Sequence, residues 1–67
     1  MNDNSPLISL NDTVKYTSLS KSFILAARDE GVFPQSVTLG TRRIAFVRSE
    51  VIEWVAARIS ARDRKVA

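Results

Sequence analysis

The fold is decided by the stretch Thr17-Ser-Leu-Ser-Lys-Ser-Phe-Ile-Leu-Ala-Ala-Arg-Asp-Glu-Gly31. Ser20 is suited to cap the start of a helix, because its hydroxyl accepts a hydrogen bond from an N–H group of the first turn that has no partner within the helix. Gly31 is suited to the left-handed position that follows the last turn. The stretch therefore predicts a helix of about three turns, with Ile24 and Ala27 facing a core.

The two faces of this helix differ in character. The chain leaves it through Val32 and Phe33, which we also expect to face the core. The opposite face carries mostly short or polar side chains, namely Lys21, Ser22, Leu25, Ala26 and Asp29. In so small a chain, such an outward face is a candidate contact surface for a partner.

The composition excludes several classes of function. A chain of 67 residues forms one small domain with a limited core. It has no cysteine and no histidine, which argues against disulfides, a metal site, a cofactor-dependent metalloenzyme and a Ser-His-Asp hydrolase. No apolar run approaches the roughly 18 residues of a membrane span, and the polar, acidic N-terminus is unlike a secretory signal. We expect a cytoplasmic protein.

The net charge of +3 is unevenly distributed. Residues 1–33 carry −1, from Lys15, Lys21 and Arg28 against Asp3, Asp12, Asp29 and Glu30. Residues 34–67 carry +4, from Arg42, Arg43, Arg48, Arg58, Arg62, Arg64 and Lys65 against Glu50, Glu53 and Asp63. Arginine predominates, and its planar guanidinium is well suited to phosphate. The charge suits nucleic acid and equally a solvated basic surface.

The N-terminal part predicts a flexible lead followed by a short helix. Residues 1–8 are rich in Asn, Asp, Ser and Pro, with apolar anchors only at Leu7 and Ile8. Ser9-Leu-Asn-Asp12 resembles a capping box with Asp in place of Glu, which predicts a first helix from about residue 10 to residue 16. The side chains expected to point inward are those of Leu10, Thr13 and Val14.

Residues 17–19 are short and polar at their start, which predicts a tight turn between the two helices. Two short helices joined in this way form a helix-turn-helix, whose second helix can lie in the major groove of DNA. The spacing alone is a weak signal, since paired amphipathic helices also occur in folds that never bind DNA.

After Gly31 the pattern changes to that of a β-hairpin. Pro34 prevents the helix from continuing, and residues 37–39 and 43–47 are rich in β-branched and apolar side chains. Residues 40–42 supply the turn, with Gly40 expected at a position that needs an unusual backbone angle.

The tip of the predicted hairpin carries Thr41, Arg42 and Arg43. Two interpretations of the arginine pair remain open at this point. The two side chains are simply solvated, or the hairpin is a wing that reaches a phosphate or the minor groove.

A third helix is predicted from Ser49, which caps it, with Glu50 in the first turn favouring the helix dipole. Its apolar side consists of Val51, Ile52, Trp54, Val55 and Ile59. Trp54 is expected in the core or at a seam rather than stacked on a base. The chain ends in a basic tail that includes Arg58, Arg62, Arg64 and Lys65, whose partner is phosphate, an acidic surface or water.

Several short blocks of the chain match the pattern of one family: Leu19-Ser-Lys-Ser-Phe-Ile24, Glu30-Gly-Val-Phe-Pro34, Val37-Thr-Leu-Gly-Thr-Arg-Arg43, Phe46, and Ser49-Glu-Val51 with Trp54. Together they resemble the AlpA family over residues 7 to about 60. The Gly-x-Phe-Pro block and the Leu-Gly-x-Arg wing, at this separation, are much more specific than the pair of helices.

The resemblance implies a small winged-helix DNA-binding protein of prophages and genomic islands, related to excisionases and to the DNA-binding domain of MerR-type regulators. Members regulate a neighbouring integrase gene, or act as recombination directionality factors that bind the attachment site and favour excision. They perform no chemistry themselves. Several copies on adjacent sites bend DNA and help an integrase to assemble.

The chain departs from the family pattern in its recognition helix. Phe23, Leu25 and Ala26 stand where Thr, Tyr and Arg are common in the family, so the family's contacts cannot be transferred to these positions. An apolar face can still read DNA, with Leu25 and Ala26 on thymine methyls and with Lys21 and Ser22 on a phosphate or a guanine edge. DNA shape then supplies much of the discrimination. Phe46 replaces a frequent Trp.

We therefore predict an α+β fold, a small winged helix-turn-helix with a two-stranded β-hairpin wing and a C-terminal helix. Residues 1–8 are the lead, residues 9–61 the DNA-binding domain and residues 62–67 the basic tail. The predicted recognition-helix contacts are Ser20, Lys21, Ser22, Leu25, Ala26 and Arg28, and the predicted wing contacts are Thr41, Arg42 and Arg43.

The predicted function is that of a non-enzymatic, double-stranded-DNA-binding protein of a mobile element. It acts as an excisionase-like directionality factor, as a regulator of the integrase gene, or as both, with an integrase and further copies on DNA as partners. The alternative is a protein-interaction module that docks a partner through Phe23 and Leu25 without DNA. Three positions remain open for the Phe23 side chain: burial against the third helix, contact with a DNA groove, or contact with a protein. An enzyme using Lys21 and Ser22 is disfavoured, because adjacent positions on a helix do not face each other.

Overall fold

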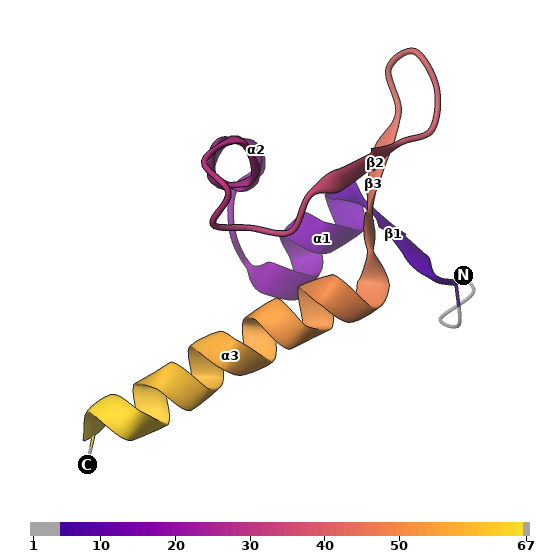
Figure 1. The fold of residues 1–67 in the computed structure, drawn as a ribbon. Helices are drawn as coiled ribbons and strands as arrows, with labels where there is room; N and C mark the ends of the chain where they lie inside the picture. The colour runs from indigo at the N-terminus through magenta and orange to yellow at the C-terminus, as the bar shows by residue number, and fades with distance from the viewer. Residues whose placement is uncertain (1–4, 67) are drawn as a thin grey trace.

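A computed structural model of the chain describes the backbone of residues 5–66 and the side chains of residues 5–62. Within this part, three helices and a small sheet pack together (Figure 1). The elements in chain order are β1 (Leu7–Ser9), α1 (Leu10–Thr17), α2 (Lys21–Asp29), β2 (Ser36–Thr38), β3 (Ile44–Val47) and α3 (Arg48–Val66). The arrangement is that of a small α+β protein, compatible with a winged helix-turn-helix as predicted.

The first two helices begin and end as their sequences predict. The Ser9 hydroxyl accepts from the Asp12 amide at 3.0 Å, and the Ser20 hydroxyl accepts from the Phe23 amide at 3.1 Å. Gly31 has φ +81°, the left-handed conformation expected of it. The turn between the helices uses a feature that the sequence did not indicate, because Ser18 has φ 64° and its amide donates to the Val14 carbonyl at 2.8 Å.

The sheet has three antiparallel strands in the order β1-β3-β2, rather than the predicted two. Leu7 pairs with Val47 and Ile8 with Phe46. The prediction of a flexible lead is therefore wrong for these two residues, while residues 1–4 lie outside the described part. A three-residue strand leaves no periodic signal of its own, and it forms because β3 offers an edge and the core accepts Ile8.

The N-terminal segment is also tied to the start of α3. The Arg48 amide donates to the Pro6 carbonyl at 2.8 Å, and Arg48 Nε donates to the Ser5 carbonyl at 2.8 Å. The predicted capping role of Ser49 is wrong, because α3 already begins at Arg48 and Ser49 lies in its first turn. A tertiary hydrogen bond thus satisfies the first amide of this helix.

The hairpin is shorter and its loop wider than predicted. Arg43 lies in the loop, before β3, and the Leu39 amide donates to the Arg43 carbonyl at 2.8 Å. The prediction of an unusual backbone angle at Gly40 is wrong, since among the described glycines only Gly31 has a positive φ. A loop spanning residues 39–43 reverses the chain without the left-handed residues that a two-residue turn demands.

The core lies between the sheet and the three helices. Its buried side chains are Ile8, Ile24, Ala27, Phe33, Phe46 and Val51, with Leu10, Val14, Leu19 and Trp54 packed around them. The Phe33 ring meets the Phe46 ring edge-on at 5.4 Å between centroids. Trp54 packs against Phe33 at 4.8 Å and donates from Nε1 to the Val32 carbonyl at 2.8 Å, so its predicted place at a seam is confirmed.

Two predictions about apolar side chains need correction. Val32 was expected to face the core, but it is 52 % exposed. Its carbonyl accepts the hydrogen bond from Trp54, whereas its side chain points outward. Ile52 and Ile59 of α3 are likewise exposed. The backbone of the predicted tail continues α3 as far as Val66, and the side chains after residue 62 lie outside the described part.

Candidate nucleic-acid interface

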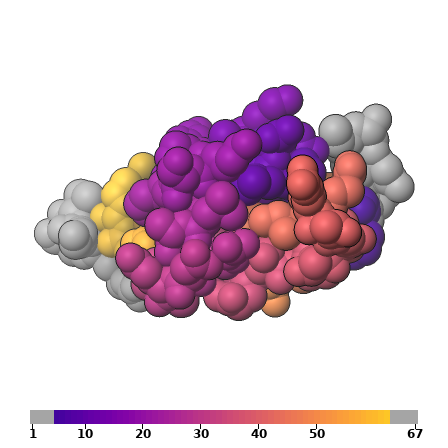
Figure 2. All heavy atoms as spheres, turned by 90° about the horizontal axis from the view of Figure 1, so that it is seen from above, coloured from indigo at the N-terminus to yellow at the C-terminus, as the bar shows by residue number. Residues whose placement is uncertain are grey.

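The outward face of α2 and the loop between β2 and β3 lie on one side of the molecule. Figure 1 shows both at the end opposite to α3, and Figure 2, looking down on that end, shows the α2 surface beside the loop. The helix is positioned by Ile24 and Ala27, which are 0 % and 4 % exposed in the core. The loop is positioned by the pairing of β2 with β3.

The α2 face presents a mixed set of predicted contact residues. Lys21, Ser22 and Ala26 are exposed, whereas Leu25 is half-buried. Ser20 is exposed, but its hydroxyl caps the helix. The helix begins next to Lys21 and Ser22, so its positive end adds to the lysine charge in attracting an anion.

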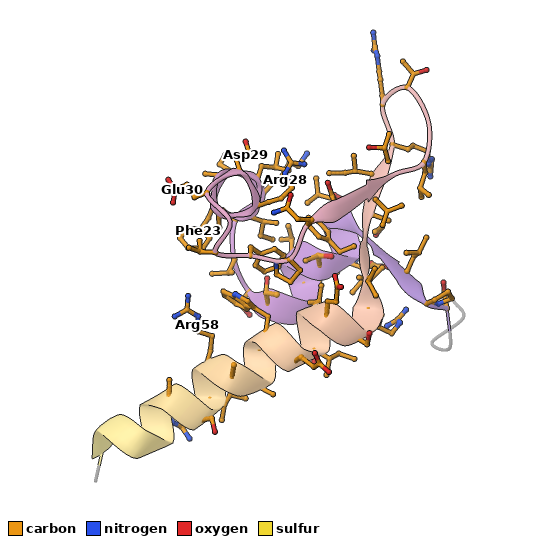
Figure 3. The ribbon with its side chains drawn as sticks, in the orientation of Figure 1. Phe23, Arg28, Asp29, Glu30 and Arg58 are labelled. Carbon is orange, nitrogen blue, oxygen red and sulfur yellow. The ribbon has the colours of Figure 1, made fainter. Side chains whose placement is uncertain are left out.

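Arg28 differs from the other predicted contacts because its guanidinium already has partners (Figure 3). Its Nε and Nη2 donate to Asp29 Oδ1 at 3.0 and 2.9 Å, and its Nη1 donates to Ser36 Oγ at 3.2 Å. Gln35 Nε2 donates to the Arg28 carbonyl at 2.9 Å. Arg28 therefore links the C-terminal end of α2 to β2 and fixes the helix relative to the hairpin.

The loop presents the three predicted wing residues to solvent. Thr41, Arg42 and Arg43 are all exposed. The backbone of the loop that carries them extends to the same side of the molecule as α2 (Figures 1 and 2). The structure thus brings the two predicted groups onto one face, and which of these residues contact DNA stays a prediction.

A second surface lies on the other side of α2, between that helix and α3. This groove is lined by residues that include Leu19, Phe23, Trp54, Val55, Arg58 and Ile59, and we call it the basic groove. Phe23 is 50 % exposed there, so it is neither buried against α3 nor on the α2 face that carries Lys21 (Figure 3). The Arg58 guanidinium stacks over the Trp54 ring at 4.7 Å from its centroid.

Sequence reasoning missed the partners that organise these surfaces. Ser36 and Gln35, which hold Arg28, carry no local signal of that role. The stacking of Arg58 on Trp54 had a signal, because positions four apart share a face of a helix. No helix of the described residues combines the length and the apolar character needed to cross a membrane.

Comparison with known proteins agrees with the geometry. The family model described as "Prophage CP4-57 regulatory protein (AlpA)" matches residues 7–59. An uncharacterised protein, ORF88 of Enterobacteria phage P4, is 44 % identical over 46 residues, which is 69 % of this chain and 52 % of the phage protein. The chain thus spans about half the length of that relative. No solved structure matches this chain. The family match covers the helix pair, the hairpin and most of α3, and the chain belongs to the AlpA family of prophage regulatory proteins.

Proposed function

We propose that this chain binds double-stranded DNA of a mobile element, where it acts as an excisionase-like recombination directionality factor, as a regulator of integrase transcription, or as both. The observation that carries the proposal is the common orientation of the α2 face and the arginine loop (Figure 2). The AlpA family is a regulatory DNA-binding family rather than an enzyme family, which supports the same conclusion.

In the proposed complex, α2 lies in the major groove and supplies the base contacts. Lys21 and Ser22 contact a phosphate or a guanine edge, and Ala26 contacts a thymine methyl. The half-buried Leu25 has less surface to offer than its sequence position indicates. With so few hydrogen-bonding groups on the helix, the shape and deformability of the DNA contribute a large part of the specificity.

The loop supplies the second anchor. Arg42 and Arg43 contact phosphates or enter the minor groove next to the major groove that α2 occupies. Arg28 contributes without contacting DNA itself, because its hydrogen bond to Ser36 holds α2 at a fixed angle to the hairpin. The distance between the helix and the arginines is thereby set before DNA is bound.

A gel-shift titration over a range of salt concentrations tests the proposal. Replacing both Arg42 and Arg43 with Ala should weaken binding to every duplex, and it should lower the slope of log affinity against log salt by about 1.8 if each makes one phosphate contact. Lys15→Ala is the control, since it removes an exposed cation on α1 outside the predicted contacts. Equal binding by the wild type and the double variant would show that the loop is not a wing.

Lys21 and Ser22 affect a different property. Lys21→Ala and Ser22→Ala should change which sequences are preferred, by the cost of about 1–3 kcal/mol that a lost base contact carries. Selection from a random duplex library measures this preference. A library profile identical to that of the wild type would place the base contacts elsewhere.

Footprinting across the genomic neighbourhood distinguishes the two proposed roles. Protection at an attachment site indicates excision, and protection at a promoter indicates transcriptional control. An integrase is the proposed protein partner at the attachment site. We also propose that copies assemble cooperatively on adjacent sites, because one domain of this size offers a small footprint.

The basic groove favours a second candidate function. Phe23 is half-exposed in an apolar groove edged by Arg58, which is the surface expected of a protein-interaction module. Such a module would bind an integrase or polymerase subunit without DNA. A stable complex that survives Arg42→Ala and Arg43→Ala, and is lost on Phe23→Ala, would favour this candidate over the first.

A further inference from the structure

The helix α3 separates two surfaces of opposite charge. On one side is the basic groove, where Arg58 lies beside the exposed side chains of Phe23 and Ile59. On the other side is a second hollow, which we call the acidic hollow, lined by residues that include Gly31, Val32, Pro34, Glu50 and Glu53. Trp54 forms part of both linings and is the wall between them.

The spacing of the charged residues explains this separation. Glu53 and Arg58 are five positions apart on α3, which places them about 140° apart around the helix axis. Trp54 is directed between them, toward the core. The two charges therefore cannot neutralise each other within one chain, and neither Glu50 nor Glu53 forms an ion pair with another residue that the structure describes.

Each surface combines its charge with exposed apolar area. Val32 is 52 % exposed at the acidic hollow, and Phe23 and Ile59 are 50 % and 51 % exposed at the basic groove. Burial of such side chains against each other is favourable, and the flanking charges select the partner. The two surfaces of one chain thus carry complementary charge and similar apolar character.

We propose that these two surfaces bind each other between copies of this chain, the acidic hollow of one copy docking on the basic groove of the next. A contact of the basic groove with itself would place Arg58 against Arg58, and a contact of the acidic hollow with itself would place carboxylates together. Only the mixed contact pairs opposite charges. Stacking on Trp54 holds the Arg58 guanidinium in place, so that less side-chain freedom is lost on docking.

A contact of this kind is heterologous, so each copy keeps one free surface and the assembly continues as a ring or an open chain. This inference rests on the proposed assembly of copies on adjacent DNA sites. It names the surfaces through which neighbouring copies contact each other. Both surfaces lie away from the exposed face of α2 that carries Lys21, so each copy can hold DNA and a neighbour together.

Sedimentation velocity of the full chain without DNA tests the contact. The wild type should self-associate in a concentration-dependent way at low salt, and the association should weaken as salt is added. Arg58→Glu and Glu53→Arg should each weaken it about tenfold or more, since each turns an attraction into a repulsion. An equimolar mixture of the two variants should regain association, because every contact between the two different chains again pairs opposite charges.

Lys15→Glu is the matched control, as it makes the same charge change at an exposed site on α1 and should leave association unchanged. Circular dichroism checks the fold of each variant, and Arg58→Gln and Glu53→Gln replace any charge reversal that unfolds. The proposal is overturned if the wild type stays monomeric up to about 1 mM. It is also overturned if association is insensitive to both reversals or is not regained on mixing.

The same wild-type protein is titrated with a short duplex that holds a single site. Binding to this duplex with no self-association would refute the proposed contact between copies and leave the proposed DNA function intact. Self-association with no duplex binding does the opposite, so the two proposals fail separately.

Discussion

The two ends of β3 (Ile44–Val47) carry arginines in opposite situations. Arg48, directly after the strand, donates through its amide and its Nε to two carbonyls of the N-terminal segment. Arg43, directly before the strand, is exposed in a loop together with Arg42. Five positions separate a side chain that stabilises the fold from one that is available to a ligand. Arginine content alone therefore overstates the basic surface that can bind phosphate.

The difference follows from what surrounds each end. At the Arg48 end, β1, β3 and α3 converge, and backbone carbonyls without strand partners need donors. At the Arg43 end, the hairpin extends past the core, and the described hydrogen bond in the loop joins two backbone groups. Substitutions at the two ends should accordingly separate stability from DNA binding.

The largest expected effect on stability is at Phe46, which lies within β3. Its packing in the core holds both ends of the strand in place. Its side chain is fully buried, so Phe46→Ala should destabilise the protein by about 3–5 kcal/mol, which is comparable to the whole stability of a small domain. Urea denaturation followed by circular dichroism measures the loss. Ile52→Ala, at a position that is 43 % exposed, is the control with a much smaller expected effect. Similar losses for both variants would contradict the assigned core.

Substitution of the two glycines should change stability by smaller amounts than Phe46→Ala does. Gly31 has φ +81°, so Gly31→Ala should cost about 1–2 kcal/mol through backbone strain although a Cβ would meet nothing within 4 Å. Gly40 also has open space around it and does not have a positive φ, so Gly40→Ala should be neutral or slightly stabilising. Thermal melts of the two variants give the comparison. A melting temperature lowered more by Gly40→Ala would mean that the loop needs an unusual backbone angle after all.

Arg48→Ala should cost about 1 kcal/mol, because the partly buried Ser5 carbonyl loses its donor while the Pro6 carbonyl keeps the backbone amide. DNA affinity of the folded protein should stay unchanged. Chemical denaturation and a gel shift on the same preparation check the two halves of this prediction. Unchanged stability together with weakened DNA binding would reverse the roles assigned to the two ends.

The smallest expected effect on stability is that of the arginine loop. Removing both side chains, with Arg42→Ala and Arg43→Ala, should leave the melting temperature of the free protein nearly unchanged, since surface substitutions away from packed features have little effect. Differential scanning calorimetry measures this, and the weaker duplex binding proposed above provides the contrast. A strongly lowered melting temperature would indicate that the loop arginines, like Arg48, serve the fold.

The parts of the fold that local chemistry controls were predictable from the sequence. Ser9, Ser20 and Gly31 act within one turn of their own positions, and all three occupy the roles that their residue types favour. Burial of Ile24 and Ala27 followed from helical spacing. The helix pair and the hairpin were therefore predictable before any tertiary contact was known.

The parts that depend on contacts distant in sequence were not predictable. The strand β1 exists because β3 offers it an edge, and α3 begins at Arg48 because its amide finds the Pro6 carbonyl. The role of Arg28 in joining α2 to β2 likewise requires Ser36 to be near in space. For the candidate interface, the residue types were predictable, whereas the distinction between anchored and exposed arginines was not.

The proposed DNA binding requires α2 and the arginine loop to act together on one duplex. The most direct measurement is a nuclear magnetic resonance titration of the labelled chain with a duplex that contains its site. We predict that the amide signals of Lys21, Ser22, Thr41 and Arg42 shift together while that of Lys15 stays in place. Shifts confined to α3 and the basic groove, with those four signals unmoved, would contradict the account.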